Sequence, residues 1–332
     1  MKKFPSRFLA LLLSAAMGFA ALPAAAAPVV KVALEGPPTE GYAELFVSVF
    51  QKYAEEKSEG RLKFSVYTNR SMGNLNTVFQ GMQFGTIQMT VQTTSNFSVF
   101  STALQVFDLP YLFPDMDSIV KTLQSQEGQA VLNTLNQKNA TVLATWPSCL
   151  RPLITSSPIK SLEDVQGMKL RTTASKSHIS NIASLGMAPT PMAGSEILTG
   201  LQQGVVKGMD PDISSMYHEG FYEVAPYFFL SDHMASAWML VCSSKWLKSL
   251  SPEDQAIIRE AGKLYAEAMF NKCSAFNEQA IKELVETKGC HLTVPSPEEK
   301  MRWVEKSKSA YDALPEDQKA VALKLRGIAW GE

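Results

Sequence analysis

Apolar positions between residues 29 and 91 switch repeatedly between the spacing of a strand and the spacing of a helix. The pattern predicts strands at residues 29–34, 62–66 and 87–91, and helices from residue 42 to about residue 58 and from residue 75 to residue 84. Strands and helices that alternate with short connections form a parallel, doubly wound sheet. We therefore predict the α/β fold class.

The second half of the chain continues this alternation and then becomes mainly helical. From the N-cap Ser251, with proline at the first helical position, one helix is predicted to run to about Thr287 and to keep one apolar side throughout. At ~1.5 Å per residue this helix would span roughly 50 Å, which is longer than one lobe of the expected size is wide. We therefore expect a helix that connects two lobes.

Arg171 ends a predicted strand in the middle of the chain. Ser161 caps a short helical turn, Gly167 ends that turn, and the strand that carries Arg171 follows. Open α/β sheets bind their ligands at this end of a strand. A second arginine, Arg151, lies in the predicted extended segment 148–155. The alternative for either arginine is a solvated side chain or a structural ion pair.

The loops that follow the predicted parallel strands offer amides, hydroxyls and an aromatic ring. Asn69 follows the second strand, and Asn96 and Phe97 follow the third. The carboxyl ends of parallel strands face one crevice, so these loops could together form a site for a small polar ligand. Ordinary polar turns are the alternative.

Length and composition favour an exported protein with two lobes. The chain has 332 residues, 45% of them apolar, which is enough for two lobes of ordinary size. Residues 1–26 have the pattern of a secretory signal peptide: three basic residues, an apolar segment from Phe8 to Leu22, and a small-residue site after which cleavage is expected at Ala26. No later apolar run has the length of a membrane span.

The charge balance argues against nucleic acid and anionic membranes as partners. Of the 31 Lys and Arg, 28 remain when the signal peptide is removed, against 32 Asp and Glu, which gives a net charge of −4. Both kinds of partner require a basic patch.

The four cysteines leave two possibilities open. Cys149 and Cys242 lie in two apolar, strand-like runs and could pair in an exported protein, or they could remain as two buried free thiols. Cys273 and Cys290 are expected not to pair, because the long helix would separate them by roughly 20 Å.

Motifs of known enzyme classes are missing from the sequence. It contains no nucleophile elbow, no phosphate-binding glycine loop, no dinucleotide fingerprint and no zinc-protease motif. Its histidines and cysteines do not have the spacing of metal ligands. We therefore expect no catalytic residues, no metal and no cofactor, and keep an exported enzyme only as an alternative.

An ordered set of short motifs resembles a known family, the extracytoplasmic solute-binding subunits of TRAP transporters (DctP-like). The motifs extend over nearly all of the mature chain: Lys57–Leu62, Gly85–Met89, Asp108–Phe113, Gly167–Arg171, Pro189–Met192 and Leu201–Gly208. Each motif is weak alone, but the ordered set is specific.

This resemblance implies a two-lobed, flytrap-like periplasmic binding protein with a long lobe-bridging helix. Arg171 is then expected to form a two-pronged salt bridge with the carboxylate of an organic acid, and Arg151 to serve as a second donor. We place residues 27–148 and about 237–270 in lobe I, and residues 149–236 and about 271–332 in lobe II. The resemblance further implies a monomer in the periplasm that delivers its ligand to the membrane subunits of a TRAP transporter, with a membrane sensor as the alternative partner.

Departures from the family pattern bear on the ligand. Met209, Asp210 and Pro211 stand where many members have further polar ligand contacts, so Asp210 could hold a ligand amine, pair with an arginine, or bind a cation. Asn76 replaces an arginine of the sialic-acid binders. We therefore expect a monocarboxylate, keto acid or aromatic acid rather than a dicarboxylate or sialic acid.

Aromatic residues could supply an apolar wall for such a ligand. The candidates are Tyr217, Phe97, Trp146 and Trp238, and packing in the core is the alternative for each. The full predicted ligand-binding set is Arg171, Arg151, Asp210, Asn96, Phe97, Tyr217, Trp146 and Asn69.

Overall fold

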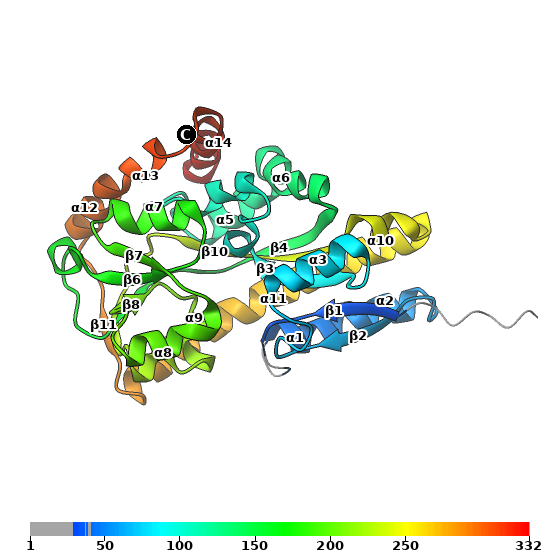
Figure 1. The fold of residues 1–332 in the computed structure, drawn as a ribbon, viewed down its shortest axis with the longest axis horizontal. Coiled ribbons are helices and arrows are strands. Elements are labelled where there is room, and N and C mark those ends of the chain that lie inside the picture. Colours follow the sequence, from blue (N-terminus) through cyan, green and yellow to red (C-terminus); the bar gives the residue numbers. More distant parts are fainter. Residues whose placement is uncertain (1–28, 37, 39–40, 332) are drawn as a thin grey trace, which may run out of the picture.

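The computed structural model describes residues 29–36, 38 and 41–331, and it shows two lobes, each built on its own β-sheet (Figure 1). The predicted two-lobed α/β fold is confirmed. The predicted signal peptide lies outside the described residues. Within the described part of the chain, no helix is both long and apolar enough to span a bilayer.

Sheet A forms the centre of lobe I and has five strands. Their order is β2 (Lys63–Tyr67), β1 (Val29–Ala33), β3 (Met89–Thr93), β10 (Ala235–Ser243) and β4 (Ala140–Leu150). β1 pairs in parallel with β2 and β3, as predicted, but β10 is antiparallel to both β3 and β4. The predicted parallel pairing is therefore confirmed for β1, β2 and β3, while β10, which enters sheet A from lobe II, runs in the opposite direction and makes the complete sheet mixed.

Helices cover both faces of sheet A. The predicted first helix is one continuous run of α1 (Gly41–Leu45), the π-helical η1 (Phe46–Gln51) and α2 (Lys52–Lys57). The others are α3 (Leu75–Phe84), α4 (Thr94–Phe97), η2 (Thr102–Asp108), α5 (Met116–Gln124), α6 (Gln126–Leu132), η3 (Asn133–Lys138) and α10 (Ser244–Ser249).

Helix α3 shows how local sequence sets element boundaries. The Asn74 side chain accepts a hydrogen bond from the Thr77 amide at the first turn. Gly85 follows the last turn with φ of 81°, a left-handed conformation that glycine adopts without steric cost. The predicted bounds, residues 75 and 84, are confirmed.

Sheet B forms the centre of lobe II and has six strands. Their order is β11 (His291–Thr293), β9 (Tyr227–Phe229), β5 (Leu153–Thr155), β8 (Gly208–Met209), β6 (Lys169–Thr172) and β7 (Ala188–Pro191). Its shorter helices are η4 (Leu162–Val165), α7 (Lys176–Ser184), η5 (Gly194–Glu196), α8 (Ile197–Gln202), α9 (Ile213–His218) and η6 (Phe221–Glu223).

Two extended segments and one long helix connect the lobes. The chain passes from β4 to β5 at Arg151 and returns from β9 to β10, and the Arg151 amide bonds the Met234 carbonyl at 2.8 Å where the two segments meet. Helix α11 (Pro252–Glu286) packs Tyr265 into the core of lobe I and Leu284 into the core of lobe II. Figure 1 shows α11 passing between the two sheets. The predicted bridging helix is confirmed.

The C-terminal helices return to lobe I. They are α12 (Pro297–Ser307), α13 (Ser309–Asp312) and α14 (Glu316–Trp330). α14 packs on α5, and Leu325 lies in the same apolar core as Ile119. The proposed lobe boundaries had grouped this helix with lobe II, whereas its contacts are with lobe I.

Cys149, Cys242 and Cys290 are free, buried thiols. Cys149 lies in the core of lobe II and Cys242 in a core of lobe I, so the possible pairing of these two residues is not formed.

Candidate ligand-binding site

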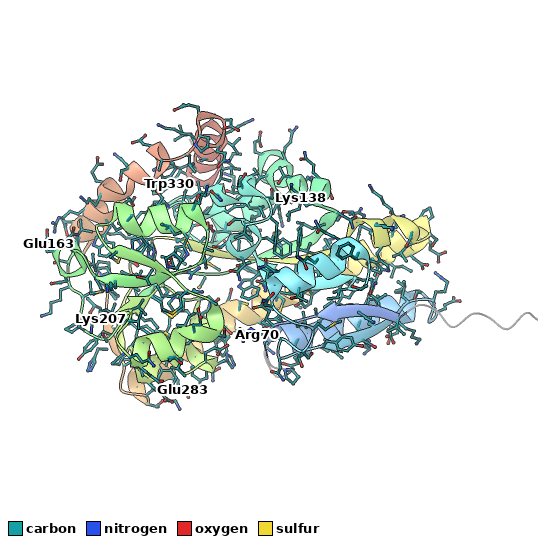
Figure 2. The ribbon with its side chains drawn as sticks, viewed as in Figure 1. Arg70, Lys138, Glu163, Lys207, Glu283 and Trp330 are labelled. Atoms are coloured by element: carbon teal, nitrogen blue, oxygen red, sulfur yellow. The ribbon has the colours of Figure 1, made fainter. Side chains whose placement is uncertain are left out.

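A cleft lies between the two lobes and contains about 840 Å³ of space, its open mouth included. Both lobes line this cleft. Lobe I contributes Glu35, Arg70, Gln92 and Asn96 among others, and lobe II contributes Arg171 and Ser215 among others. Figure 2 places Arg70 at the side of lobe I that faces lobe II. A solute bound here would contact both lobes at once.

Arg171 brings a buried positive charge to the cleft. Strand β6 carries it, and only 8% of the residue is exposed. Its Nε and Nη2 donate to the Met192 carbonyl at 3.1 and 3.0 Å, and it forms no ion pair with a carboxylate among the described residues. Burial, with a smaller effect of Arg151, lowers the pKa of the guanidinium to about 10, so it stays charged at neutral pH. A desolvated charge of this kind favours an anionic ligand.

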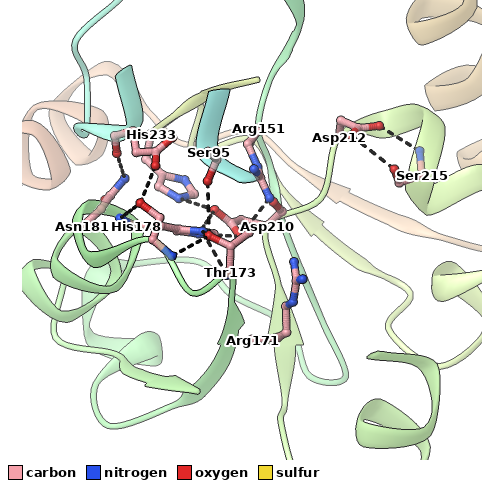
Figure 3. Close-up of polar contacts among 12 residues, drawn as sticks. Ser95, Arg151, Arg171, Thr173, His178, Asn181, Asp210, Asp212, Ser215 and His233 are labelled. Carbon is pink, nitrogen blue, oxygen red and sulfur yellow. Dashed lines mark hydrogen bonds and ion pairs between the residues drawn. The ribbon is translucent and has the colours of Figure 1, made fainter. Parts of the chain in front are cut away.

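Arg151 lies beside Arg171, but its charge is already compensated. Its Nε donates to the Asp210 carbonyl oxygen, and its Nη2 lies 3.3 Å from the Asp210 carboxylate. Figure 3 shows the Arg171 guanidinium pointing toward Arg151 and Asp210. The two arginines therefore meet, as predicted, but they bring one net positive charge rather than two.

Asp210 lies behind the arginines and is fully buried. His178 Nε2 donates to its carboxylate at 2.9 Å, and His233 Nε2 lies 3.3 Å away without hydrogen-bond geometry. Burial alone would raise the pKa of Asp210, but Arg151 and His178 hold this pKa well below its usual value. Of the three roles that the sequence left open for Asp210, the structure shows the pairing with an arginine.

His178 connects Asp210 to the next part of this network. Burial lowers the pKa of its imidazole, so the ring is neutral at pH 7. The Thr173 amide donates to Nδ1 at 3.2 Å, which leaves the proton on Nε2 to bond Asp210. The cluster of Arg151, Asp210 and His178 therefore carries no net charge.

Hydrogen bonds at the floor of the cleft join the two lobes (Figure 3). Ser95 of α4 in lobe I and Thr173 of lobe II have their hydroxyl oxygens 3.2 Å apart. Ser175 of lobe II donates to the carboxylate of Asp108 in lobe I at 2.5 Å. Burial raises the pKa of Asp108 to about 6. At the floor of the cleft the lobes thus meet through polar groups, which can separate and be solvated more easily than an apolar contact.

Three of the predicted site residues line the cleft. Arg171 and Arg151 do so at its floor, and Asn96 does so on the wall of lobe I, where its amide donates to Gln92 at 2.8 Å. Asp210 is adjacent to them but is covered by Arg151.

The other four predicted site residues lie elsewhere. Phe97 is fully buried between Phe79 and Phe100 in the core, and Asn69 is exposed outside the cleft. Tyr217 points toward α11 and donates to Glu283 at 2.7 Å. Trp146 is 1% exposed and lines a neighbouring pocket. For Phe97 and Tyr217 the alternative of packing or structural contacts is the one that the structure shows.

Several cleft residues were not predicted as ligand contacts. Tyr42 lies within a predicted helix, and Gln92 lies between the predicted strand 87–91 and the polar residues named in the loop after it. Glu35 and Arg70 lie in the crevice-facing loops that the sequence indicated, with Arg70 Nε 3.7 Å from the Glu35 carboxylate. The positions of Glu35 and Arg70 in these loops could have identified them as cleft residues. Nothing in the sequence marked Tyr42 or Gln92 as a cleft residue.

Two lobes with a cleft between them, lined from both sides, are the architecture of a two-lobed solute-binding protein. The chain belongs to the DctP family, described as bacterial extracellular solute-binding protein, family 7, whose sequence model matches residues 36–318. The resemblance to the solute-binding subunits of TRAP transporters is thereby confirmed, and so is the periplasmic location.

Similar proteins carry names of organic-acid receptors. The C4-dicarboxylate-binding periplasmic protein DctP of Shewanella loihica is 29% identical over 263 residues, which cover 79% of this chain and 78% of that protein. The 2,3-diketo-L-gulonate-binding periplasmic protein YiaO of Escherichia coli is 30% identical over 214 residues, covering 64% and 65%. A TRAP periplasmic solute-binding protein of a Bradyrhizobium species, solved with galacturonate, is 26% identical with a TM-score of 0.83, covering 90% of this chain and 99% of that one.

Proposed function

We propose that this protein is the periplasmic receptor of a TRAP-type transporter and that it binds a monocarboxylate, whose carboxylate occupies the position in front of Arg171. The observation that carries this proposal is the buried guanidinium of Arg171, whose hydrogen-bond acceptor among the described residues is the neutral Met192 carbonyl. The planar fork of a guanidinium matches a carboxylate in geometry and in charge.

The charges around the cleft favour one carboxylate over two. Arg151 is neutralised by Asp210, so the floor offers one uncompensated positive charge. The carboxylates of Asp212 and Glu219 also line the cleft and would repel a second anionic group of the ligand, whereas Glu35 is paired there with Arg70. The relatives named above include receptors for dicarboxylates and for sugar acids, which share the carboxylate and differ in the remainder of the ligand.

The remaining contacts would come from the other lobe. The amides of Gln92 and Asn96 lie on the wall of lobe I, opposite Arg171 of lobe II. A ligand held by Arg171 and by this wall stabilises the conformation in which the lobes are close together. The membrane subunits of the transporter would then receive the closed, loaded receptor.

Arg171→Ala tests the carboxylate assignment. Removal of one partner from a buried charge pair costs about 3 to 5 kcal/mol, so we expect at least a several-hundred-fold loss of affinity in titration calorimetry. A panel of mono-, di-, keto- and aromatic acids, screened first by thermal unfolding, supplies the ligand, since saturation at ~100 times Kd adds about 2.7 kcal/mol to stability.

Arg302→Ala is the matched control. It removes an equally long cationic side chain from a surface ion pair with Glu163, far from the cleft, and should leave affinity unchanged. Unaltered binding in a folded Arg171→Ala protein would refute the assignment.

A further inference from the structure

A second pocket adjoins the cleft and has a different chemical character. It contains about 590 Å³ of space, its mouth included. We call this space the aromatic pocket. Its apolar lining consists mainly of Tyr42, Trp146, Trp238, Met269 and Phe276. Tyr42, Trp238 and Asp212 line both the cleft and this pocket, so one wall is common to the two spaces.

Both lobes build the aromatic pocket. Tyr42 of α1 and Trp238 of β10 stack with ring centroids 5.6 Å apart, and Trp146 of β4 packs edge-on against Tyr265 at 5.2 Å. Phe276 comes from the second half of α11 and belongs to the core of lobe II. A group that fills this pocket would therefore contact both lobes, as a ligand in the cleft does.

The polar residues around the aromatic pocket are already engaged. Lys272 forms an ion pair with Glu44 at 2.5 Å, and Asp212 accepts from the Ser215 amide at 2.8 Å. Among the described residues the pocket therefore offers no unpaired cation for a second anionic group of the ligand, and the Asp212 carboxylate would repel such a group.

One donor in the lining lacks a partner. The Trp146 indole Nε1 is buried and has no hydrogen-bond acceptor among the described residues. Buried indole N–H groups are usually satisfied, and an acceptor on a bound molecule would do this.

We propose that the physiological ligand is an amphipathic monocarboxylate whose carboxylate binds Arg171 and whose aryl or branched-alkyl body extends past Tyr42 and Trp238 into the aromatic pocket. This inference rests on the proposed function, because the carboxylate contact fixes one end of the ligand. It narrows the ligand from organic acids in general to those with an apolar body.

A series of 2-hydroxy acids tests the apolar body. Lactate, 2-hydroxyisocaproate and phenyllactate share the carboxylate and the 2-hydroxyl group and differ only in the body, and gluconate is the polyhydroxylated comparison. Burial of one methylene contributes a factor of roughly four in affinity. We therefore expect titration calorimetry to give at least a hundredfold tighter Kd for phenyllactate than for lactate, and no comparable gain for gluconate.

Cys273→Phe tests the location of the body. Cys273 lies on α11 and lines the pocket, so a phenylalanine there would occupy the space that the ligand requires. We expect this variant to lose the advantage of phenyllactate while keeping the affinity for lactate. Ala275→Phe adds the same ring to an exposed position of the same helix and should change neither affinity.

Trp146→Phe is the second variant and keeps most of the ring volume. In the parent protein we expect a para-methoxy group on phenyllactate to accept a hydrogen bond from the Trp146 indole and to raise the affinity. Trp146→Phe should remove this gain in affinity, because the indole donor is lost. This measurement also applies if Cys273→Phe does not fold.

The outcomes separate the two proposals. If gluconate binds as tightly as phenyllactate and Cys273→Phe is without effect, the apolar body is refuted while the carboxylate assignment stands. If no member of the series binds the folded protein, or if Arg171→Ala binds them all as well as the parent does, the proposed function itself fails.

Discussion

Asp210 sets the charge at the floor of the cleft without lining the cleft itself. Its carboxylate neutralises Arg151, and this leaves Arg171 as the uncompensated cation at the floor. The chemistry of the site is therefore decided by a residue that is fully buried behind it.

Asp210→Asn should change both stability and selectivity. The substitution leaves the Arg151 charge buried without a counter-charge, which costs about 3 to 5 kcal/mol of unfolding free energy. It also adds one net positive charge beside Arg171, so the affinity for succinate should rise relative to that for a monocarboxylate. Denaturant unfolding and calorimetry measure the two effects, and an unchanged ratio of the two affinities would contradict the charge argument.

Asp108 should make stability depend on pH in the mildly acidic range. Burial raises its pKa to about 6 in the folded protein, from 3.8 for an ordinary aspartate, so the native state retains a proton that the unfolded state loses first. Its contribution to stability is therefore complete below pH 3.8 and is lost as the pH rises through 6. Relative to Asp108→Asn, the parent protein should lose roughly 3 kcal/mol between pH 4 and pH 7. If the free energy of unfolding changed with pH to the same extent in both proteins, this prediction would be contradicted.

At the residue scale, the sequence predicted the arginines and left pairing of Asp210 with an arginine open as one of three roles, but it did not show which arginine is paired. Arg171 could be recognised because it ends a strand, and the end of a strand is a local property. Asp210, His178 and Arg151 are separated by tens of residues along the chain, and only the folded structure brings Arg151 and His178 within 3.3 Å of Asp210. The prediction that Phe97 and Tyr217 form a wall of the ligand site was wrong for a related reason. The sequence places an aromatic ring on a loop or a helix, but it does not show in which direction the ring points.

Strand β8 is two residues long, yet it positions the floor of the cleft. Gly208 begins it, and a Cβ at this position would lie 2.3 Å from the Ile154 carbonyl oxygen of the paired strand β5. The close approach of these two backbones is what allows Met209 and Asp210 to follow in their observed positions.

Gly208→Ala should therefore weaken ligand binding as well as stability. A clash with backbone forces the strands apart, at a cost of about 1 to 3 kcal/mol or more. Gly85→Ala is the matched control, since its added Cβ meets nothing within 4 Å and only the left-handed backbone is penalised, by about 1 to 2 kcal/mol. Calorimetry should show reduced affinity for the first variant alone, and equal affinities would show that β8 tolerates the displacement.

At the element scale, prediction succeeded where boundaries have local causes. Helix α3 has a side-chain cap and a terminal glycine, and α11 has a capping serine followed by proline, so both could be located from sequence. The direction of β10 could not be predicted, because an apolar strand has the same sequence pattern in a parallel and in an antiparallel pair.

The polar contact between Ser95 and Thr173 offers a way to test lobe movement in the whole molecule. Their hydroxyl oxygens lie 3.2 Å apart across the lobe boundary, which is close enough for the two positions to support a disulfide when both are cysteine. We expect the oxidised Ser95→Cys/Thr173→Cys protein to exchange ligand at least tenfold more slowly than its reduced form. The single variants under the same oxidant are controls, and unchanged exchange in the cross-linked protein would show that the ligand enters without lobe separation.

At the scale of the whole molecule, the two lobes and the bridging helix could be predicted, because the length of α11 exceeds one lobe. The assignment of chain segments to lobes was harder. α14 carries an amphipathic pattern that would suit either lobe, and only its packing on α5 shows which one it contacts.

The position of β10 in sheet A has a consequence for how the protein is made. β10 lies between β3 and β4 and pairs with both, but it follows β4 by more than eighty residues, after five of the six strands of sheet B. Until residue 243 has emerged on the far side of the membrane, β3 and β4 each present an unpaired edge, and such edges are prone to join with other chains. Secretion of this receptor therefore has a vulnerable interval that begins when β4 appears and ends when β10 inserts, and chaperones that shield strand edges would act during that interval.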